Sequence, residues 1–235
     1  MIHIKRSDER HFSNRGWLKT YWLFSFSDYH DPENIHFGSL RVFNDDLIEA
    51  EKGFPEHRHE EMEIVTIVLD GELTHQDNMG NRDVVKSGQV QWMSAGTGVI
   101  HSEFNNGDKP VHLYQIWIFP RTKGLQPEYH KKEFSQSDWK NNLLPVASGQ
   151  DFSGSLPMQA DATIFKSHMD TGKQFEYRAG RSRHIFVYLN SGKMMVNGKK
   201  IERGDQAQIT DEEVLEFRVM KDTEFVMIDV PPYNE

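Results

Sequence analysis

The sequence contains no cysteine among its 235 residues. Disulfide bonds, zinc–thiolate sites and thiol catalysis are therefore excluded. The chain also lacks any run approaching the roughly 18 apolar residues of a membrane-spanning helix. Its first residues, MIHIKRSDERHF, lack the apolar core of a signal peptide. From these absences we expect a cytoplasmic protein that does not bind membranes.

Acidic residues outnumber basic ones, with 36 Asp and Glu against 27 Lys and Arg. The formal net charge is −9. Binding to nucleic acid needs a basic face that neutralises phosphates, so we expect no direct nucleic-acid partner. A local exception is the cluster formed by Arg178, Arg181, Arg183 and His184. We interpret this cluster as a solvated strand edge in preference to an anion-binding site.

Helical periodicity is scarce as well, and short β-branched and aromatic runs take its place. They are separated by Gly, Asn and Asp, as in MEIVTIVLDGELTH, VHLYQIWIF and HIFVYLNSGKMMVNG. This pattern predicts an all-β sandwich or barrel. Asp70-Gly71 and Asn197-Gly198 predict hairpin turns, and Met79-Gly80-Asn81 predicts another tight turn.

The chain changes composition near its middle, where residues 121–150 are polar and interrupted. We interpret this stretch as the connection between two β domains, with a short helix near Ser135 to Asn142. The predicted domains are residues 1–125, and residues 126–235 comprising the linker and the C-terminal domain.

A faint internal repeat supports two domains of one fold. Gly71 lies eight positions after Glu63 around the first apolar strand, and Gly192 lies eight positions after His184 around the second. The second copy lacks the metal-ligating residue types of the first. We therefore expect a metal site in the N-terminal domain only.

Two pairs of metal-ligating residue types occur with the spacing i, i+2: His57-x-His59 and His101-x-Glu103. Side chains two residues apart on a strand project from the same face. An isolated His-x-His is more often a chance surface feature, but a second such pair beside apolar strands favours coordination over costly unpaired burial. Three nitrogens and one carboxylate suit Fe, Ni, Co, Mn or Zn.

The remaining histidines, including His75, are expected to be satisfied by hydrogen bonds or to face solvent. If residues 57–63 formed one unbroken strand, Glu61 and Glu63 would crowd the same site. We therefore expect a turn or bulge after His59. Glu63 is then predicted to lie outside the ligand set, behind it or facing outward.

Two longer patterns resemble the paired motifs of the cupin superfamily. They are Gly53…His57-x-His59-x-x-x-Glu63…Gly71 and Gly88…Gly98-x-x-His101-x-x-x-Asn105. In most cupins the fourth ligand belongs to the first motif, at the position of Glu63. In pirins it belongs to the second, at the position of Glu103. GFPEHRHEEMEIVTIVLDGELTHQDNMGN and GQVQWMSAGTGVIHSEFN resemble pirins, closely over residues 1–120 and more weakly beyond.

The pirin resemblance implies a bicupin: two antiparallel β-barrel (jelly-roll) domains packed together, with one divalent transition-metal ion in the first. Iron is favoured over Ni, Co, Mn or Zn. His57, His59, His101 and Glu103 are the implied ligands.

The same resemblance implies quercetin 2,3-dioxygenase activity on a flavonol and dioxygen, with Glu103 as the catalytic base. Phe54 and Gln115 are candidate substrate contacts, although core packing and a structural hydrogen bond explain them equally well. The alternative is a non-enzymatic, metal-dependent regulator that binds a protein partner, either a transcription factor or a metabolic enzyme. A third and weaker hypothesis is a cupin isomerase or a small-molecule binding module.

Overall fold

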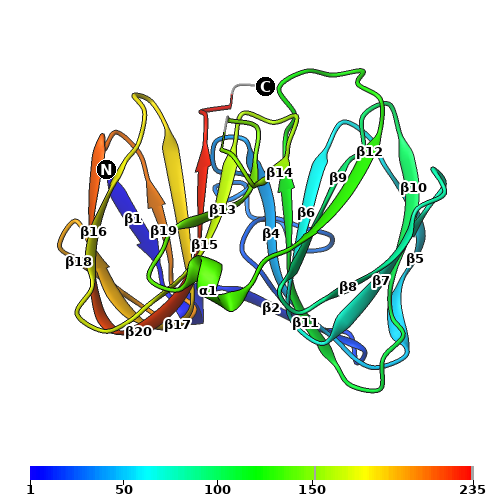
Figure 1. The fold of residues 1–235 in the computed structure, drawn as a ribbon, viewed down its shortest axis with the longest axis horizontal. Coiled ribbons are helices and arrows are strands. Elements are labelled where there is room, and N and C mark those ends of the chain that lie inside the picture. The colour runs from blue at the N-terminus through cyan, green and yellow to red at the C-terminus, as the bar shows by residue number, and fades with distance from the viewer. Residues whose placement is uncertain (151, 234–235) are drawn as a thin grey trace.

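The computed structural model describes residues 1–150 and 152–233, which form two β-rich halves packed side by side (Figure 1). The N-terminal half is built from two facing antiparallel sheets. The seven-stranded sheet has the order β12-β9-β6-β11-β4-β3-β2, and the four-stranded sheet the order β5-β10-β7-β8. Their strands are β2 (His11–Asn14), β3 (Leu18–Trp22), β4 (Leu40–Ile48), β5 (Lys52–His59), β6 (Glu63–Asp70), β7 (Glu72–Asp77), β8 (Arg82–Lys86), β9 (Gln89–Ser94), β10 (Val99–Asn105), β11 (Val111–Ile118) and β12 (Glu128–Glu133).

The C-terminal half is one nine-stranded sheet that folds back on itself. Its two long strands, of 13 and 17 residues, pair with different partners at their two ends. The register breaks between Leu189 and Met194, next to Gly192, which has a φ of 87°. The strands are β1 (Ile2–Lys5), β13 (Leu144–Ser148), β14 (Leu156–Pro157), β15 (Thr163–Met169), β16 (Gln174–Arg178), β17 (His184–Val196), β18 (Lys199–Glu202), β19 (Gln206–Ile209) and β20 (Val214–Val230).

The prediction of an all-β, antiparallel, two-part architecture is therefore confirmed. Over the described residues the pairings leave every sheet open at its edges, so each half consists of facing sheet layers without a closed ring of strands. A shared apolar cluster joins the halves. It combines Phe43, Trp92 and Tyr114 of the first half with Phe186 and Tyr188 of the second.

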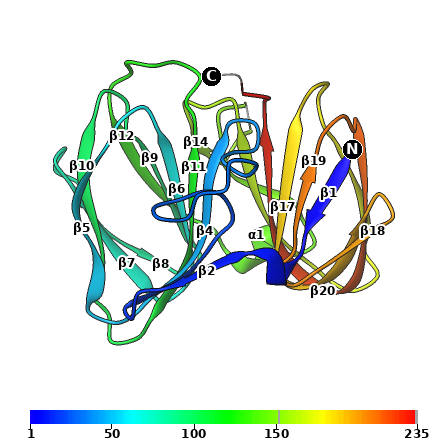
Figure 2. The same ribbon diagram turned by 180° about the vertical axis from the view of Figure 1, so that it is seen from behind.

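Two strands lie in a different half from the one expected from their place in the sequence. Strand β1 pairs with β19, so Ile2–Lys5 belong to the C-terminal sheet (Figure 2). Strand β12 pairs with β9, so Glu128–Glu133 belong to the N-terminal sheet. In both cases a distant segment supplies the hydrogen bonds that an exposed sheet edge would otherwise lack.

The predicted local turns have mixed outcomes. Asn197 and Gly198, with φ of 42° and 76°, join the paired strands β17 and β18, as a type I′ hairpin requires. The hairpin predicted at Asp70-Gly71 is wrong, because β6 and β7 belong to different sheets and the turn carries the chain from one to the other. The expected helix is present as α1 (Gln136–Trp139), and a 3-10 turn, η1 (Ser7–Glu9), follows β1.

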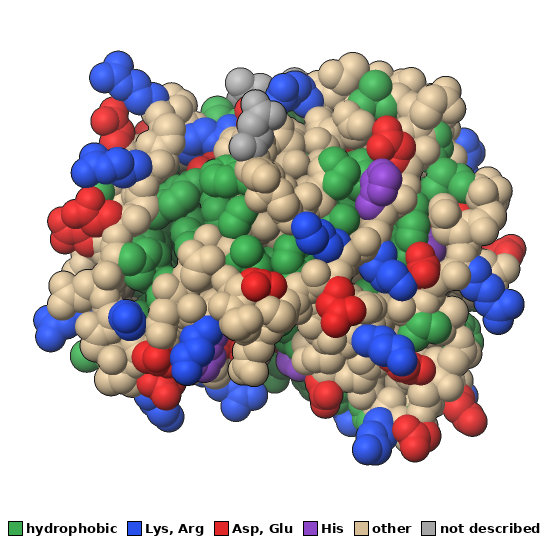
Figure 3. All heavy atoms as spheres, in the orientation of Figure 1, with side chains coloured by type: hydrophobic (Ala, Val, Ile, Leu, Met, Phe, Trp, Pro, Cys, Tyr) green, Lys and Arg blue, Asp and Glu red, His purple; other side chains and the backbone are tan. Residues whose placement is uncertain are grey.

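Charges of both signs are interspersed over the face seen in Figure 3. In the basic cluster, Arg178 pairs with Glu176, Arg181 with Glu213, and Arg183 with Asp161 and Asp229, so carboxylates neutralise its three arginines. Among the described residues, no helix has the length and apolar character needed to cross a membrane.

Candidate metal centre

Three neighbouring strands of the four-stranded sheet each present a polar i, i+2 pair to the interior of the N-terminal half. Strand β10 lies between β5 and β7. Its His101 lies opposite His57 of β5 and Asp77 of β7, and its Glu103 lies opposite His75. The three pairs are His57 and His59, His101 and Glu103, and His75 and Asp77.

The chain turns sharply after His59, as predicted. Strand β5 ends at His59 and β6 begins at Glu63, with Glu61 between them in the left-handed region at a φ of 48°. The side chain of Glu63 is fully buried, and its Oε2 accepts hydrogen bonds from Trp92 Nε1 and the Gln159 backbone N–H, each at 2.8 Å. Glu63 thus faces the junction with the C-terminal half and lies outside the histidine cluster.

The imidazoles of His57, His59 and His101 converge, and one ring nitrogen from each lies within 4.8 Å of the others. The Nε2 atoms of His57 and His101 are 3.1 Å apart. Two nitrogens that each lie about 2.1 Å from one ion, at nearly a right angle, are separated by about 3 Å. The spacing therefore fits two ligands of a single metal ion.

In His57 and in His101, the other ring nitrogen is occupied by a neighbour. His57 Nδ1 donates to the carbonyl of Pro55 at 2.8 Å, which leaves a lone pair on its Nε2. His101 Nδ1 lies 3.4 Å from His75 Nδ1, and His75 Nε2 donates to the Asp77 carboxylate at 3.0 Å. His75 Nδ1 is then an acceptor, so His101 donates from Nδ1 and also directs a lone pair from Nε2. Two lone pairs that face each other at 3.1 Å repel, and a cation bound between them would remove this repulsion.

The electrostatics of the cluster favour neutral imidazoles. Burial, together with the nearby rings of His101 and His57, lowers the pKa of His59 to about 4. Burial, together with His57 and His75, lowers the pKa of His101 to about 3. Neutral imidazole is the form that binds a metal, so the pocket holds these ligands ready at neutral pH.

Glu103 lies next to this cluster, where amide groups hold its carboxylate. Its side chain is buried, and its two oxygens accept hydrogen bonds from Gln91 Nε2 at 2.6 Å and Gln115 Nε2 at 2.7 Å. The Thr66 hydroxyl joins these amides, accepting from Gln91 and donating to Gln115, each at 3.0 Å. The carboxylate groups most closely with His101 and His75, so His101 belongs to both clusters.

The pair His75-x-Asp77 was missed by the sequence interpretation, although THQD has the same spacing as the two recognised pairs. Hydrogen-bond donors alone contact the Asp77 carboxylate: His75 Nε2, Asn81 Nδ2 and the backbone N–H groups of Met79 and Asn81. Burial opposes the charge, but the hydrogen bonds from His75 and Asn81 outweigh it and lower the pKa of Asp77. Asp77 therefore sets the tautomer of His75, and through it the orientation of His101.

We expect Asp77→Asn to weaken metal binding by about 10- to 100-fold, the usual effect of removing a partner behind a histidine ligand. The orientation that keeps an oxygen facing the backbone N–H groups of Met79 and Asn81 turns the new NH2 group toward His75 Nε2, so His75 loses its tautomer. Isothermal titration of metal-depleted protein measures the change, with Asp108→Asn on an exposed loop as the control. Unchanged affinity in Asp77→Asn would contradict the role assigned to Asp77.

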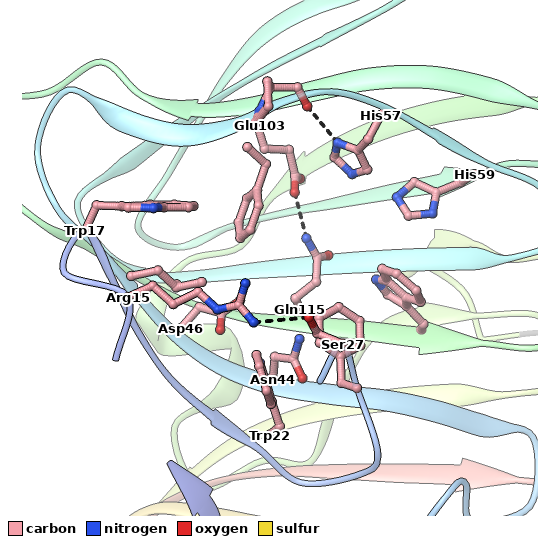
Figure 4. Close-up of a pocket in the computed structure, with 15 residues that line it drawn as sticks. Arg15, Trp17, Trp22, Ser27, Asn44, Asp46, His57, His59, Glu103 and Gln115 are labelled. Carbon is pink, nitrogen blue, oxygen red and sulfur yellow. Dashed lines mark hydrogen bonds between the residues drawn. The ribbon is translucent and has the colours of Figure 1, made fainter. Parts of the chain in front are cut away.

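The histidine cluster opens onto a cavity of about 530 Å³ (Figure 4). Five of its fifteen lining residues are Trp or Phe, including an edge-to-face pair of Trp17 and Phe54 with centroids 5.2 Å apart. The apolar lining residues are Trp17, Leu18, Trp22, Phe26, Phe54, Pro55 and Trp117, and the polar lining residues are Arg15, Ser27, Asn44, Asp46, His57, His59, Glu103 and Gln115. Both candidate substrate contacts, Phe54 and Gln115, therefore line the cavity. It suits a flat aromatic ligand that reaches the histidines.

Comparison with known families agrees with this arrangement. Residues 5–118 match the family described as Pirin, and residues 145–230 match the family described as Quercetinase C-terminal cupin domain. The two matches cover the two halves of the fold.

Individual relatives cover nearly the whole chain. A quercetin 2,3-dioxygenase of Escherichia coli strain K12 is 38% identical over 233 residues, which cover 99% of this chain and 100% of the relative. A pirin-like protein of Caulobacter vibrioides is 39% identical, with 97% and 99% covered. The crystal structure of the bacterial pirin YhhW from Escherichia coli in complex with nickel(II) superposes with a TM-score of 0.94 at 37% identity, covering 99% of this chain and 100% of the other.

Proposed function

The chain belongs to the pirin family, and from this premise we propose that it is a metal-dependent dioxygenase that cleaves a flavonol such as quercetin. The observation that carries the proposal is the convergence of three imidazoles beside a buried carboxylate, at one side of an aromatic-walled cavity. Relatives that carry the name quercetin 2,3-dioxygenase support it.

In this proposal His57, His59, His101 and Glu103 hold one divalent transition-metal ion. The donor set suits iron, which we favour, as well as nickel, cobalt, manganese and zinc. When bound, such an ion would coordinate the flavonol through its 3-hydroxyl and 4-carbonyl oxygens and lower the pKa of the hydroxyl. Nickel(II) in the structure of the E. coli relative supports a divalent ion of this class.

The residues of this chain supply the remaining functions. Glu103 is proposed to accept the proton of the 3-hydroxyl, because its carboxylate lies beside the cluster and amide donors stabilise its charge. Phe54 is proposed to pack against the flat ring system. Gln115 retains an acceptor lone pair on Oε1, since Thr66 is the one donor to that atom among the described residues, and we propose that it contacts a substrate hydroxyl. The aromatic walls exclude water from the reacting atoms.

The proposed reaction consumes one flavonol and one dioxygen. The central ring opens and carbon monoxide leaves. Both atoms of dioxygen are retained in the product, which is an ester that also carries a carboxylate. No other reductant or oxidant is required.

The test is turnover of quercetin by protein depleted of metal with a chelator and reloaded with Fe(II) or Ni(II) in parallel. We expect about one bound equivalent, oxygen uptake and carbon monoxide release in equal amounts, and no turnover by depleted protein. Bound metal without turnover would overturn the enzymatic proposal and favour the metal-dependent regulator. A protein that binds neither metal would contradict the ligand assignment itself.

A further inference from the structure

A second cavity of about 530 Å³ lies at the junction of the two halves, away from the candidate metal centre. The segment from η1 to β2 crosses from the C-terminal half to the N-terminal half along it (Figure 2). Consecutive residues of a strand face opposite sides of its sheet. On β4, Asn44 and Asp46 line the cavity at the metal centre, whereas Asp45 and Leu47 line the second cavity. The two cavities therefore lie on opposite faces of the seven-stranded sheet.

Arg10 is held rigidly in the wall of this second cavity. Its side chain is 11% exposed, and its guanidinium lies over the ring of Tyr21, with Cζ 3.8 Å from the ring centroid. Nε donates to the carbonyl of Ser7 at 2.9 Å, and Nη1 donates to the hydroxyl of Tyr188 at 2.6 Å. Because the guanidinium is already ordered, it would lose little side-chain entropy on binding an anion.

The carboxylate of Asp45 is fully engaged in the same network. Its Oδ1 accepts from His112 Nε2 and its Oδ2 from the Tyr188 hydroxyl, each at 2.6 Å, and Arg10 Nη1 lies 4.0 Å from Oδ2. Burial and the charge of Asp45 raise the pKa of Tyr188, so this phenol stays protonated and donates. Asp45 is the one carboxylate among the described residues that line the cavity.

The hydrogen-bonding capacity that remains at the cavity consists mainly of donors. Arg10 Nη2, the Tyr21 hydroxyl and the Ser7 hydroxyl donate to no other side chain or carbonyl among the described residues. A guanidinium has no acceptor atom, and three of the five N–H groups of Arg10 are unused. A ligand at this position must therefore bring acceptor atoms.

The charges at the cavity leave a surplus of one positive charge. Arg10 offsets Asp45, and Lys19 is paired with Glu49 at 3.1 Å. Arg203 is exposed at the rim and forms no ion pair among the described residues. This surplus is local, because the whole chain carries a formal net charge of −9. A monoanion would balance it, whereas a dianion would leave a negative charge uncompensated.

We propose that this second cavity is a binding site for a small organic carboxylate with an apolar body. Arg10 and Arg203 supply the positive charge, and Tyr21 supplies a neutral donor. Phe12, which is 49% exposed, and Leu47 offer apolar contacts for the body of the ligand. Cavities of this kind, at the junction of two folded units with a few polar groups fixed in an apolar wall, are typical of small-molecule sites. The proposal does not depend on the flavonol function.

The test compares benzoate with benzamide, a neutral probe of nearly the same size and shape. Binding is measured by isothermal titration of metal-depleted protein, so that the carboxylate has no metal ion to bind. We expect benzoate to bind about 10- to 100-fold more tightly than benzamide, because its charge pairs with the guanidinium groups. Added sodium chloride is expected to weaken the binding of benzoate and to leave that of benzamide unchanged.

Variants then assign the preference to the cavity. Arg203→Gln removes an exposed charge and is expected to weaken benzoate binding about three- to tenfold, with benzamide binding and metal affinity unchanged. Arg10→Lys keeps the charge but loses the planar fork, and we expect a loss of about tenfold or more. Tyr21→Phe keeps the ring beneath Arg10 and removes the hydroxyl, so a loss of about threefold or more is expected. Arg218→Gln, on an exposed position of β20, is the matched control.

Three results would overturn the proposal. The first is that wild-type protein binds benzoate no better than benzamide, or does not bind benzoate at all. The second is that Arg203→Gln and Arg10→Lys, both shown to be folded by circular dichroism, bind benzoate as tightly as wild type. The third is that benzoate binding falls in Phe54→Ala, on the wall of the other cavity, and stays level in Arg10→Lys, because the probe then occupies the cavity at the metal centre.

Discussion

His101→Ala is expected to raise the dissociation constant for the metal by about 100-fold or more and to reduce quercetin turnover in proportion to the lost occupancy. His101 is buried on the central strand of the sheet, and it joins His57 through Nε2 and His75 through Nδ1. Four-ligand zinc sites bind with about 10–16 kcal/mol. One ligand in four then accounts for roughly 3 kcal/mol, which corresponds to about a 100-fold change.

The measurement is metal content after dialysis against a fixed concentration of free metal, followed by turnover of the same samples. His3→Ala, which removes an exposed histidine from β1, is the control and is expected to behave as wild type. Circular dichroism establishes that the variant is folded. A folded His101→Ala protein that retains full metal content would place the ion elsewhere and contradict the assigned centre.

The candidate ligand pairs could be recognised in the sequence because their geometry is local. Side chains two residues apart on a strand share a face. The spacing of His57-x-His59 and of His101-x-Glu103 therefore predicts two side chains that can bind the same ion, without knowledge of the fold. His75-x-Asp77 carries the same local signature. Its role could not be inferred, because it depends on β7 lying beside β10, a pairing that no local pattern encodes.

The same distinction explains the outcomes for the fold. Alternating apolar runs predict strands, and the Asn197-Gly198 hairpin follows from the conformations that its two residues adopt. At Asp70-Gly71 the turn itself is present, but the strands it joins pair with other partners in separate sheets. The edge positions of β1 and β12 likewise depend on segments far away in the chain.

Long-range register also creates the polar row on the inner face of the seven-stranded sheet. Gln115 stood out in the sequence as the only amide in YQIWIF. Its alignment with Asn44 and Thr66 arises only when three strands from distant parts of the sequence pair. The candidate ligands, Phe54 and Gln115 were therefore visible in the sequence, whereas the alignment of Gln91 and Thr66 with Gln115 around Glu103 required the structure.

Glu103→Gln is expected to lower the turnover number by about 10²- to 10⁴-fold even when the protein is saturated with metal. The range is that of a general base removed from its reacting group. The carboxylate of Glu103 accepts from Gln91 and Gln115, so a glutamine at position 103 presents an NH2 group to one of these donors. Neither neighbour flips freely, because both are also bonded to Thr66. The new side chain therefore loses both its charge and its fixed orientation.

Two measurements separate the loss of the base from the loss of a ligand. Metal titration gives the change in affinity, and turnover is then compared at full occupancy. In the absence of oxygen, bound quercetin should show the red-shifted absorption of the deprotonated flavonol in wild type, whereas in Glu103→Gln it should keep the spectrum of the protonated form. Glu103→Asp, which keeps a carboxylate with a shorter reach, is expected to recover part of the shift. A metal-saturated Glu103→Gln protein that still deprotonates the flavonol would remove Glu103 from the role of base and leave it only as a ligand.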